Sequence, residues 1–235
     1  MPILSAFGAA RALGVTGEPP VQNYSYDFNS AYLQYPTNAA FAIGNYDFSI
    51  ECFVYLNSTP SIDARILDFG YVNSTSLTYR NKLAFFINNS REPTIARALS
   101  TGGQTWSSSI AVPLSTWTYI AASRSGSDIY IFVNSSLGRQ TTFMGTLVTS
   151  SNPPTIGTGV YNTTRYFDGK ISNLRFNVGS GFTTATVPTK PLEPQATTKI
   201  LTCKSATITD NSTANGGGPW SITNSGVTVS TSGPF

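Results

Sequence analysis

The sequence predicts an all-β protein built as a sandwich of two antiparallel sheets. Short runs rich in β-branched and aromatic residues alternate with clusters of turn residues along most of the 235-residue chain. No long segment has the 3.6-residue period of an amphipathic helix, and no unit repeats at a fixed spacing. Many short strands with frequent turns and few helix formers are typical of such a sandwich.

The chain is expected to consist of an N-terminal arm, residues 1–22, and a single sandwich domain, residues 23–235. The arm is small, apolar and punctuated by glycine, and Pro19-Pro20 forces an extended path. An anchor that docks on a neighbouring subunit and a disordered terminus explain this composition equally well. The candidate anchoring residues are Ile3, Leu4, Phe7 and Arg11.

The first strong strand is expected at Asp47–Leu56, where every second residue is apolar. Phe53 and Tyr55 make the other face of this run apolar as well, so it fits a central strand with both faces covered. Ala64–Phe69 and Leu83–Ile87 are expected as the next strands.

The clearest hairpin joins Trp117–Arg124 to Asp128–Val133, because a short loop that contains glycine separates two β-rich runs. Asn134–Gly138 is the expected next turn, and Gln140–Leu147 is expected to return as another strand. Trp117 is placed in the core by this pattern.

The strand expected at Gly169–Phe176 alternates imperfectly, which indicates a bulge near Ser172 and Asn173. Residues 179–198 are rich in threonine and proline, so we expect an irregular connection across the surface. The final strands are expected at Lys199–Cys203, around Ile208 and at Gly226–Ser230.

The composition excludes several classes of function. Fourteen basic and 11 acidic residues give a net charge of only +3, which argues against a basic nucleic-acid-binding surface. The absence of histidine removes Ser-His-Asp chemistry and histidine metal sites. No run approaches the length of a membrane span, and we expect no cofactor. Cys52 and Cys203 are expected to be buried free thiols, since the sequence shows no secretory signal.

Four blocks of sequence carry a resemblance to a known family. They follow one another in the order Tyr26–Leu33, Phe48–Tyr55, Trp117–Asn134 and Phe167–Arg175. Together they resemble the laminin-G-like, concanavalin A-like jelly-roll family. The resemblance implies a jelly roll of two antiparallel sheets, whose first block is a hairpin.

The C-terminal stretch indicates which version of this domain the chain resembles. Lys199–Ser205, Asp210–Ser212 and Ser232–Phe235 look like the version of the domain found in structural proteins of tailed bacteriophages, notably marine and cyanobacterial ones. The resemblance implies a non-enzymatic virion surface protein, made in the host cytoplasm, that decorates the capsid or belongs to a tail fibre or spike. Its implied partners are the major capsid protein or tail and fibre proteins, together with further copies of itself.

The competing hypothesis is a carbohydrate-binding adhesin that recognises host surface polysaccharide. Sugar sites combine an aromatic platform with surrounding polar groups, so aromatic residues in polar, loop-like surroundings are the candidates. An alternative explanation is that such residues cover the ends of the sandwich. The candidates are Trp106, Tyr161 and Trp220.

Catalysis and metal binding are weaker interpretations. Glycoside hydrolysis needs two carboxylates flanking the sugar bond, and Glu51 stands alone on its expected strand, so we assign no catalytic residue and expect no enzyme. Many laminin-G-like domains bind calcium, but aspartates next to turns more often bond the nearby backbone, so we assign no metal site. The aspartates weighed for calcium are Asp68, Asp128 and Asp168.

Overall fold

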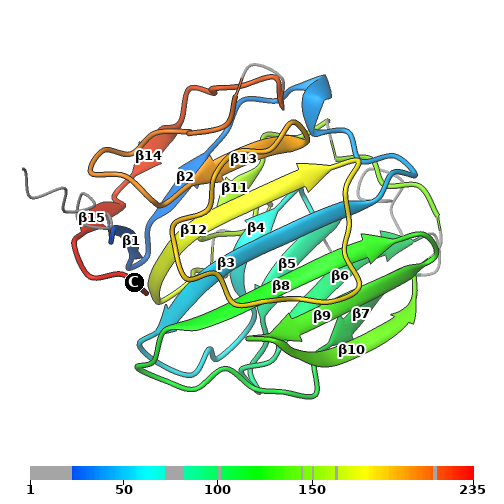
Figure 1. The fold of residues 1–235 in the computed structure, drawn as a ribbon, viewed down its shortest axis with the longest axis horizontal. Helices are drawn as coiled ribbons and strands as arrows, with labels where there is room; N and C mark the ends of the chain where they lie inside the picture. Colours follow the sequence, from blue (N-terminus) through cyan, green and yellow to red (C-terminus); the bar gives the residue numbers. More distant parts are fainter. Residues whose placement is uncertain are drawn as a thin grey trace, which may run out of the picture.

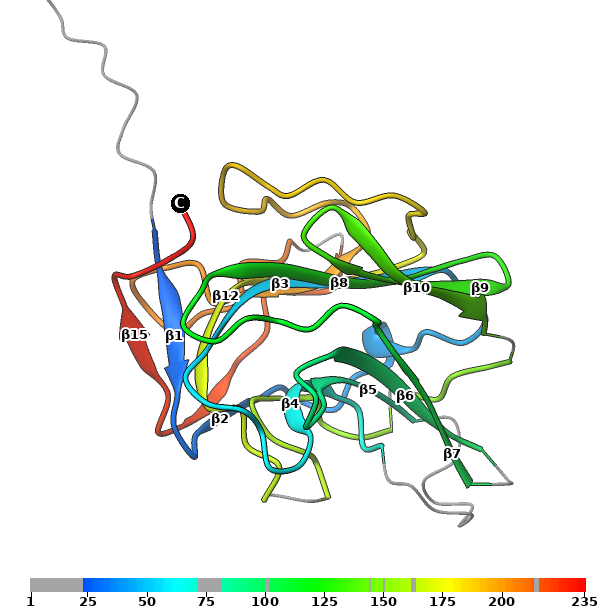
Figure 2. The ribbon, with the colours of Figure 1, turned by 90° about the horizontal axis from the view of Figure 1, so that it is seen from below.

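Two antiparallel sheets stack face to face, as the sequence predicts (Figures 1 and 2). The computed structural model describes residues 23–71, 82–99, 102–143, 145–149, 151–161, 164–213 and 216–235. Within these ranges the named helical element is the 3₁₀ turn η1 (Ala39–Phe41), and no helix there is long and apolar enough to span a membrane. The predicted arm, with Ile3, Leu4, Phe7 and Arg11, lies outside the described residues.

The larger sheet has eight strands. They are β1 (Ser25–Phe28), β3 (Phe48–Leu56), β8 (Thr118–Ser125), β9 (Asp128–Val133), β10 (Ser136–Thr142), β12 (Gly169–Val178), β13 (Thr198–Thr202) and β15 (Thr228–Ser230). Their order is β10-β9-β8-β3-β12-β1-β15, and β13 pairs with β12. Strand β3 is therefore central, as its two apolar faces predict.

The smaller sheet has seven strands. They are β2 (Tyr32–Gln34), β4 (Ala64–Asp68), β5 (Leu83–Ile87), β6 (Pro93–Leu99), β7 (Gly102–Ser107), β11 (Thr155–Ile156) and β14 (Thr223–Ser225). Their order is β14-β2-β11-β4-β5-β6-β7. Strands β5 and β9 begin and end at the predicted residues. Strands β6 and β7 have no counterpart among the predicted strands, because polar residues such as Thr94 and Gln104 interrupt their apolar pattern.

The core fills the space between the sheets. The rings of Phe69, which follows β4, and Phe176 on β12 have centroids 5.1 Å apart and connect the two layers. Cys52 and Cys203 are free and buried in this core, which confirms the sequence-based prediction. Burial raises the pKa of both thiols well above its ordinary value.

The first block of the family resemblance does not form a hairpin. Strand β1 pairs with β12 and β15 in the larger sheet, whereas β2 pairs with β11 and β14 in the smaller one. Both Phe28 and Leu33 are completely buried in the core between the sheets. The chain therefore crosses from one layer to the other, so that each layer contributes one of these side chains to the same core.

Other local predictions are corrected by the structure. The return strand β10 starts at Ser136, earlier than predicted, because Asn134 turns the chain with a φ of 54°. Ile208 lies in a bend rather than a strand, where Tyr26 donates a hydrogen bond to the Thr207 carbonyl. The bulge is confirmed, since the register of β12 against β3 shifts just after Ser172.

Trp117 lies on the outer face of the larger sheet and not in the core between the sheets. Its ring centroid is 5.6 Å from that of Tyr55. The sequence pattern misplaced Trp117 because this sheet also carries an apolar cluster on its outer face, built on Phe53, Tyr119 and Phe132.

Residues 179–197, which we call the strap, cross the outer face of the larger sheet between β12 and β13 (Figures 1 and 2). This confirms the irregular surface connection predicted for residues 179–198. Phe182, Ala185 and Val187 of the strap pack against the outer apolar cluster. The strap therefore covers part of the sheet and forms one wall of the site described next.

Candidate functional site

Polar side chains gather on the outer face of three neighbouring strands of the larger sheet. Strands β3 and β12 pair in a register that sets Glu51 opposite Arg175 and Ser49 opposite Asn177. Strand β8 contributes Tyr119 from the other side of β3. Because side chains on one face of a strand recur every second residue, these five lie together beneath the strap.

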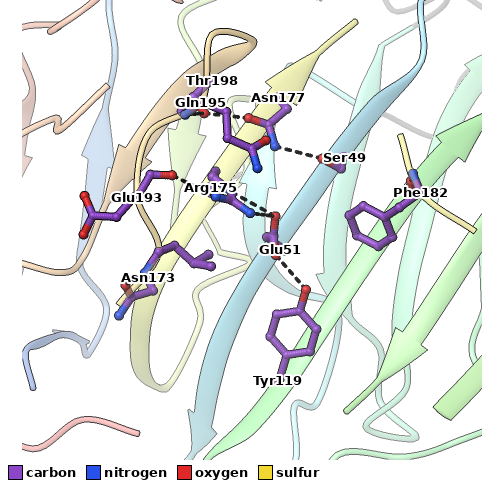
Figure 3. Close-up of polar contacts among 12 residues, drawn as sticks. Ser49, Glu51, Tyr119, Asn173, Arg175, Asn177, Phe182, Glu193, Gln195 and Thr198 are labelled. Atoms are coloured by element: carbon purple, nitrogen blue, oxygen red, sulfur yellow. Dashed lines mark hydrogen bonds and ion pairs between the residues drawn. The ribbon is translucent and has the colours of Figure 1, made fainter. Parts of the chain in front are cut away.

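Glu51 is the centre of this group and is only 4% exposed. Arg175 donates from Nε and Nη2 to Glu51 Oε1 at 3.0 and 2.7 Å, and the Tyr119 hydroxyl donates to Oε2 at 2.7 Å (Figure 3). Burial, together with the charge of Glu51, raises the pKa of Tyr119 well above 10. The Tyr119 hydroxyl therefore keeps its proton and remains a donor.

The strap is fixed to this group at its C-terminal end. Arg175 Nη1 donates to the Glu193 carbonyl at 2.8 Å. Asn177 accepts from the Thr198 hydroxyl at 2.7 Å and donates to Ser49 Oγ at 3.0 Å. The backbone N–H of Gln195 donates to the Thr198 hydroxyl at 2.8 Å. Hydrogen bonds thus hold both the floor and this end of the strap.

The other end of the strap is fixed to β8. The backbone N–H of Phe182 donates to Ser123 Oγ at 2.6 Å. A Cβ on Gly181 would lie 1.8 Å from the Arg124 carbonyl oxygen, so only glycine allows the strap to approach β8 so closely. This approach places Phe182 over the sheet, where its ring centroid is 5.9 Å from that of Phe132.

A cavity of about 320 Å³ remains between the sheet and the strap, and we call it the polar pocket. Its floor is the group around Glu51 (Figure 3). Its walls are Ser180, Gly181, Phe182, Thr184, Ala185, Thr186 and Gln195. Hydroxyl, amide, guanidinium and aromatic groups therefore surround a space within the size range of small-molecule sites.

The structure does not bring the three predicted platform residues together. Trp106 lies on β7 with its ring centroid 5.0 Å from that of Phe143. Tyr161 is 47% exposed, and its hydroxyl donates to Asn152 Oδ1 at 2.8 Å. Each of the three has different neighbours, so they do not form one platform, and glycan binding by any of them stays a prediction.

Trp220 lines a second hollow, of about 500 Å³, with Ile208, Thr209, Asp210, Pro219, Ser221 and Ile222. Its ring packs on Phe41 at a centroid distance of 5.0 Å, and its indole N–H donates to the Lys199 carbonyl at 2.8 Å. Both oxygens of Asp210 accept hydrogen bonds from the protein. The carboxylate and the indole N–H at the second hollow are thus both engaged within the protein.

The aspartates weighed for calcium lie apart from one another. Asp68 is buried in the smaller sheet and accepts from the backbone N–H groups of Gly70 and Tyr71. Asp128 and Asp168 lie at opposite ends of the larger sheet. Among the described residues, no three His, Cys, Asp or Glu side chains form a metal-binding group.

The polar pocket is not visible in the sequence. Its floor residues are far apart in the sequence and meet only through the pairing of β12, β3 and β8. One usable signal was present, since Glu51 interrupts the apolar run of a predicted central strand. A charge in that position needs a partner on a neighbouring strand.

A match to a known protein family identifies the superfamily of this fold. A family model described as the concanavalin A-like lectin/glucanases superfamily, Laminin_G_3, matches residues 27–177. The chain belongs to this superfamily. The match ends at Asn177, so it includes the floor of the polar pocket and excludes the strap. No curated protein matches the chain.

Solved structures agree with this fold. A candidate carbohydrate-binding protein from Bacteroides ovatus aligns with a TM-score of 0.64 and 15% identity, covering 91% of this chain and 61% of that one. The chain thus spans less than two thirds of that protein's length. A heptameric SAP-like pentraxin from Limulus polyphemus aligns with a TM-score of 0.53 and 11% identity, covering 90% and 96%.

The carbohydrate-binding module CBM40 of the Ruminococcus gnavus IT-sialidase, bound to α2,3-sialyllactose, is another similar structure. Its TM-score is 0.53 at 13% identity, with 69% of this chain and 94% of that chain covered. At these identities the likeness shows a shared fold alone. What the polar pocket binds must be argued from its own residues.

Proposed function

We propose that the protein is a carbohydrate-binding domain that holds one sugar ring in the polar pocket. The observation that carries the proposal is the floor itself, where Glu51, Arg175 and Asn177 are fixed by hydrogen bonds and still face a cavity of about 320 Å³. Two of the similar structures are described as carbohydrate-binding, which supports the proposal without deciding it.

The floor is already arranged before a ligand arrives. Glu51 and Asn177 are almost fully buried, and Arg175 is held by both Glu51 and the strap. A ligand that binds here does not have to order long, mobile side chains, so less of the binding free energy is lost to side-chain ordering. Phe182 gives the pocket an apolar wall on which the C–H face of a sugar can pack.

The pocket supports binding rather than hydrolysis. Glu51 is the one carboxylate among the described residues that line it, and Arg175 engages that carboxylate. Glycoside hydrolysis requires a second carboxyl group on the other side of the scissile bond. We therefore propose a domain that binds its ligand without turning it over.

A virion location is a separate proposal, and it rests on the C-terminal resemblance to phage structural proteins. In the structure these sequence blocks hold the fold together: the Ser25 hydroxyl donates to the Ser232 carbonyl, and the Phe235 ring packs on Phe53 at 5.2 Å. The proposed role is display of the sugar site on a phage capsid or tail, docked through the arm.

The virion proposal is tested by deleting residues 1–20 and examining assembled phage particles. We expect the truncated domain to fold and to be absent from particles. Normal incorporation of the truncated protein would contradict docking through the arm.

Sugar binding is tested with a broad glycan array, followed by calorimetric titration of the best ligand. Substituting Gln195, whose side chain is exposed at the pocket wall, by alanine should weaken binding about fivefold, the equivalent of one hydrogen bond. The matched control is Gln140→Ala on β10, away from the pocket, which should bind normally. Binding to no glycan, or binding lost only in a Trp220→Ala variant, would contradict the assignment.

A further inference from the structure

The polar pocket carries no net charge. Arg175 and Glu51 form an ion pair with side chains only 12% and 5% exposed, and the other described residues that line the pocket are uncharged. Glu193, the one carboxylate in the sequence of the strap, is 79% exposed and pairs with Lys204. A ligand in the pocket therefore meets one buried positive group directly beside one buried negative group.

Both members of this ion pair keep unused hydrogen-bonding capacity. A guanidinium has five N–H groups, and the described contacts of Arg175 use one on Nε, one on Nη1 and one on Nη2. Among the described residues, Glu51 Oε2 accepts from Tyr119 alone, and a carboxylate oxygen can accept a second hydrogen bond. Arg175 and Glu51, whose side chains lie side by side on the floor (Figure 3), can thus offer a ligand a further donor and a further acceptor.

A second pair of polar side chains, Asn177 and Ser49, follows along the same two strands, and both members can still donate a hydrogen bond. Asn177 uses one of its two amide N–H groups on Ser49, and the Ser49 hydroxyl still has its own hydrogen to donate. Positions two residues apart on a strand are about 7 Å apart, so this pair lies one step from the first. One sugar ring is large enough to reach both pairs with hydroxyls at two of its positions.

We infer that the polar pocket selects neutral sugar rings and rejects acidic ones, an inference that rests on the proposed function. A hydroxyl accepts from Arg175 and donates to Glu51 at the same time, so it matches the paired donor and acceptor. A carboxylate accepts from Arg175 but has no hydrogen to donate to Glu51. Its charge is also repelled by the Glu51 carboxylate at short range in a poorly hydrated site, which works against binding.

The inference is tested with matched pairs of sugars that differ only at C6. Oligomers of glucose, galactose and mannose are compared with oligomers of glucuronic, galacturonic and mannuronic acid on an array and then by titration. We expect the bound neutral oligomer to bind at least about tenfold more tightly than its acidic counterpart. Tighter binding of the acidic member would overturn this inference and leave sugar binding intact, whereas binding of neither class would overturn both.

The Glu51→Gln variant tests the cause of the selectivity. The glutamine side chain keeps the size of the site and can still accept from Tyr119, but the pocket then carries the positive charge of Arg175. The preference should reverse, with the ratio of acidic to neutral affinity rising by about two orders of magnitude. An unchanged preference in this folded variant would contradict the inference.

A second variant covers the case in which Glu51→Gln does not fold. The double variant Glu51→Gln/Arg175→Gln removes both charges together, so no buried charge is left without a partner. We expect it to bind neutral and acidic members of a pair within about threefold of each other. A double variant that keeps the full tenfold preference would show that the ion pair is not its source. Gln140→Ala serves again as the control with wild-type selectivity.

Discussion

Glu51 and Asp210 are both nearly buried carboxylates, 4% and 6% exposed, and the structure uses them in different ways. In the described part of the chain, Glu51 accepts from the side chains of Arg175 and Tyr119, on two other strands, and it faces the polar pocket. Asp210 accepts from the backbone N–H groups of Leu201 and Trp220, at 3.0 and 2.9 Å.

Asp210 also has further contacts that Glu51 lacks. Its oxygens also accept from the hydroxyls of Tyr35 and Ser212, and a Cβ on Gly218 would lie 2.8 Å from its Oδ2. Asp210 therefore holds β13 and the C-terminal segment together, and although it lines the second hollow, its two oxygens already accept four hydrogen bonds. Glu51 keeps free capacity that points into a cavity. The comparison separates a carboxylate that stabilises the fold from one that is available to a ligand.

Asp210→Ala should have the largest effect on stability. The substitution leaves two backbone N–H groups and two hydroxyls without their acceptor, so we expect the free energy of unfolding to fall by about 3–5 kcal/mol. Urea denaturation measures the change. The control is Asp128→Ala, which removes a solvent-exposed hydrogen bond from Gln140 and should cost less than about 0.5 kcal/mol. A loss below about 1 kcal/mol for Asp210→Ala would mean that its contacts do not hold the fold together.

Arg175→Met should have the next largest effect, because it leaves the buried Glu51 carboxylate without a counter-charge. We expect a loss of about 3 kcal/mol, most of which returns in the double variant Glu51→Gln/Arg175→Met. A double-mutant cycle by urea denaturation measures this coupling. Strictly additive losses would contradict the ion pair as the source of the effect.

Tyr119→Phe removes one buried hydrogen bond to Glu51, and we expect it to cost about 1–2 kcal/mol at neutral pH. It should also change the alkaline limb of the stability profile. The pKa of Tyr119 is raised in the folded state, so its contribution is complete below the unfolded value near pH 10. Above that pH the unfolded chain loses the proton first, and stability falls as the pH rises.

The size of this alkaline effect is measurable in Tyr119→Phe. Each such group contributes a slope of up to about 1.4 kcal/mol per pH unit above pH 10. The pKa of Tyr35 is also raised by burial, so Tyr35 still makes stability depend on pH in the variant. Urea denaturation between pH 9 and pH 11.5 should therefore show a shallower decline for Tyr119→Phe than for the wild type. Equal slopes would contradict the raised pKa.

Gln195→Ala should have the smallest effect on stability, below about 0.5 kcal/mol, since its side chain is exposed at the pocket wall. Its sugar affinity should nevertheless fall, which makes it the reverse of Asp210→Ala. Paired denaturation and titration of the two variants check this. A stability loss in Gln195→Ala comparable to that in Asp210→Ala would remove the distinction between the two regions.

The sequence predicted the layers of the fold better than its edges. Strand β9 was found to the residue because the run at Asp128–Val133 is apolar and bounded by turn residues. The bulge after Ser172 was visible as a break in alternation. Trp117 was misplaced because a sequence does not show which face of a sheet a strap covers.

The candidate site was hidden from the sequence for a related reason. Its floor depends on registers that set Arg175 opposite Glu51 and bring Tyr119 across from Phe53. Such pairings join residues separated by much of the chain, and local patterns do not specify them. Trp106 and Trp220 were predicted to form a sugar platform because they lie in polar segments, but both are partly buried against the core.

The most direct test of the central claim is amide chemical-shift mapping with the neutral oligosaccharide selected on the array. The backbone N–H signals of Gly181, Phe182 and Gln195 should shift in a saturable way, because these residues wall the polar pocket. The indole N–H of Trp220, held by the Lys199 carbonyl, should stay in place. Saturable shifts at Trp220 with no change at the pocket amides would contradict the account.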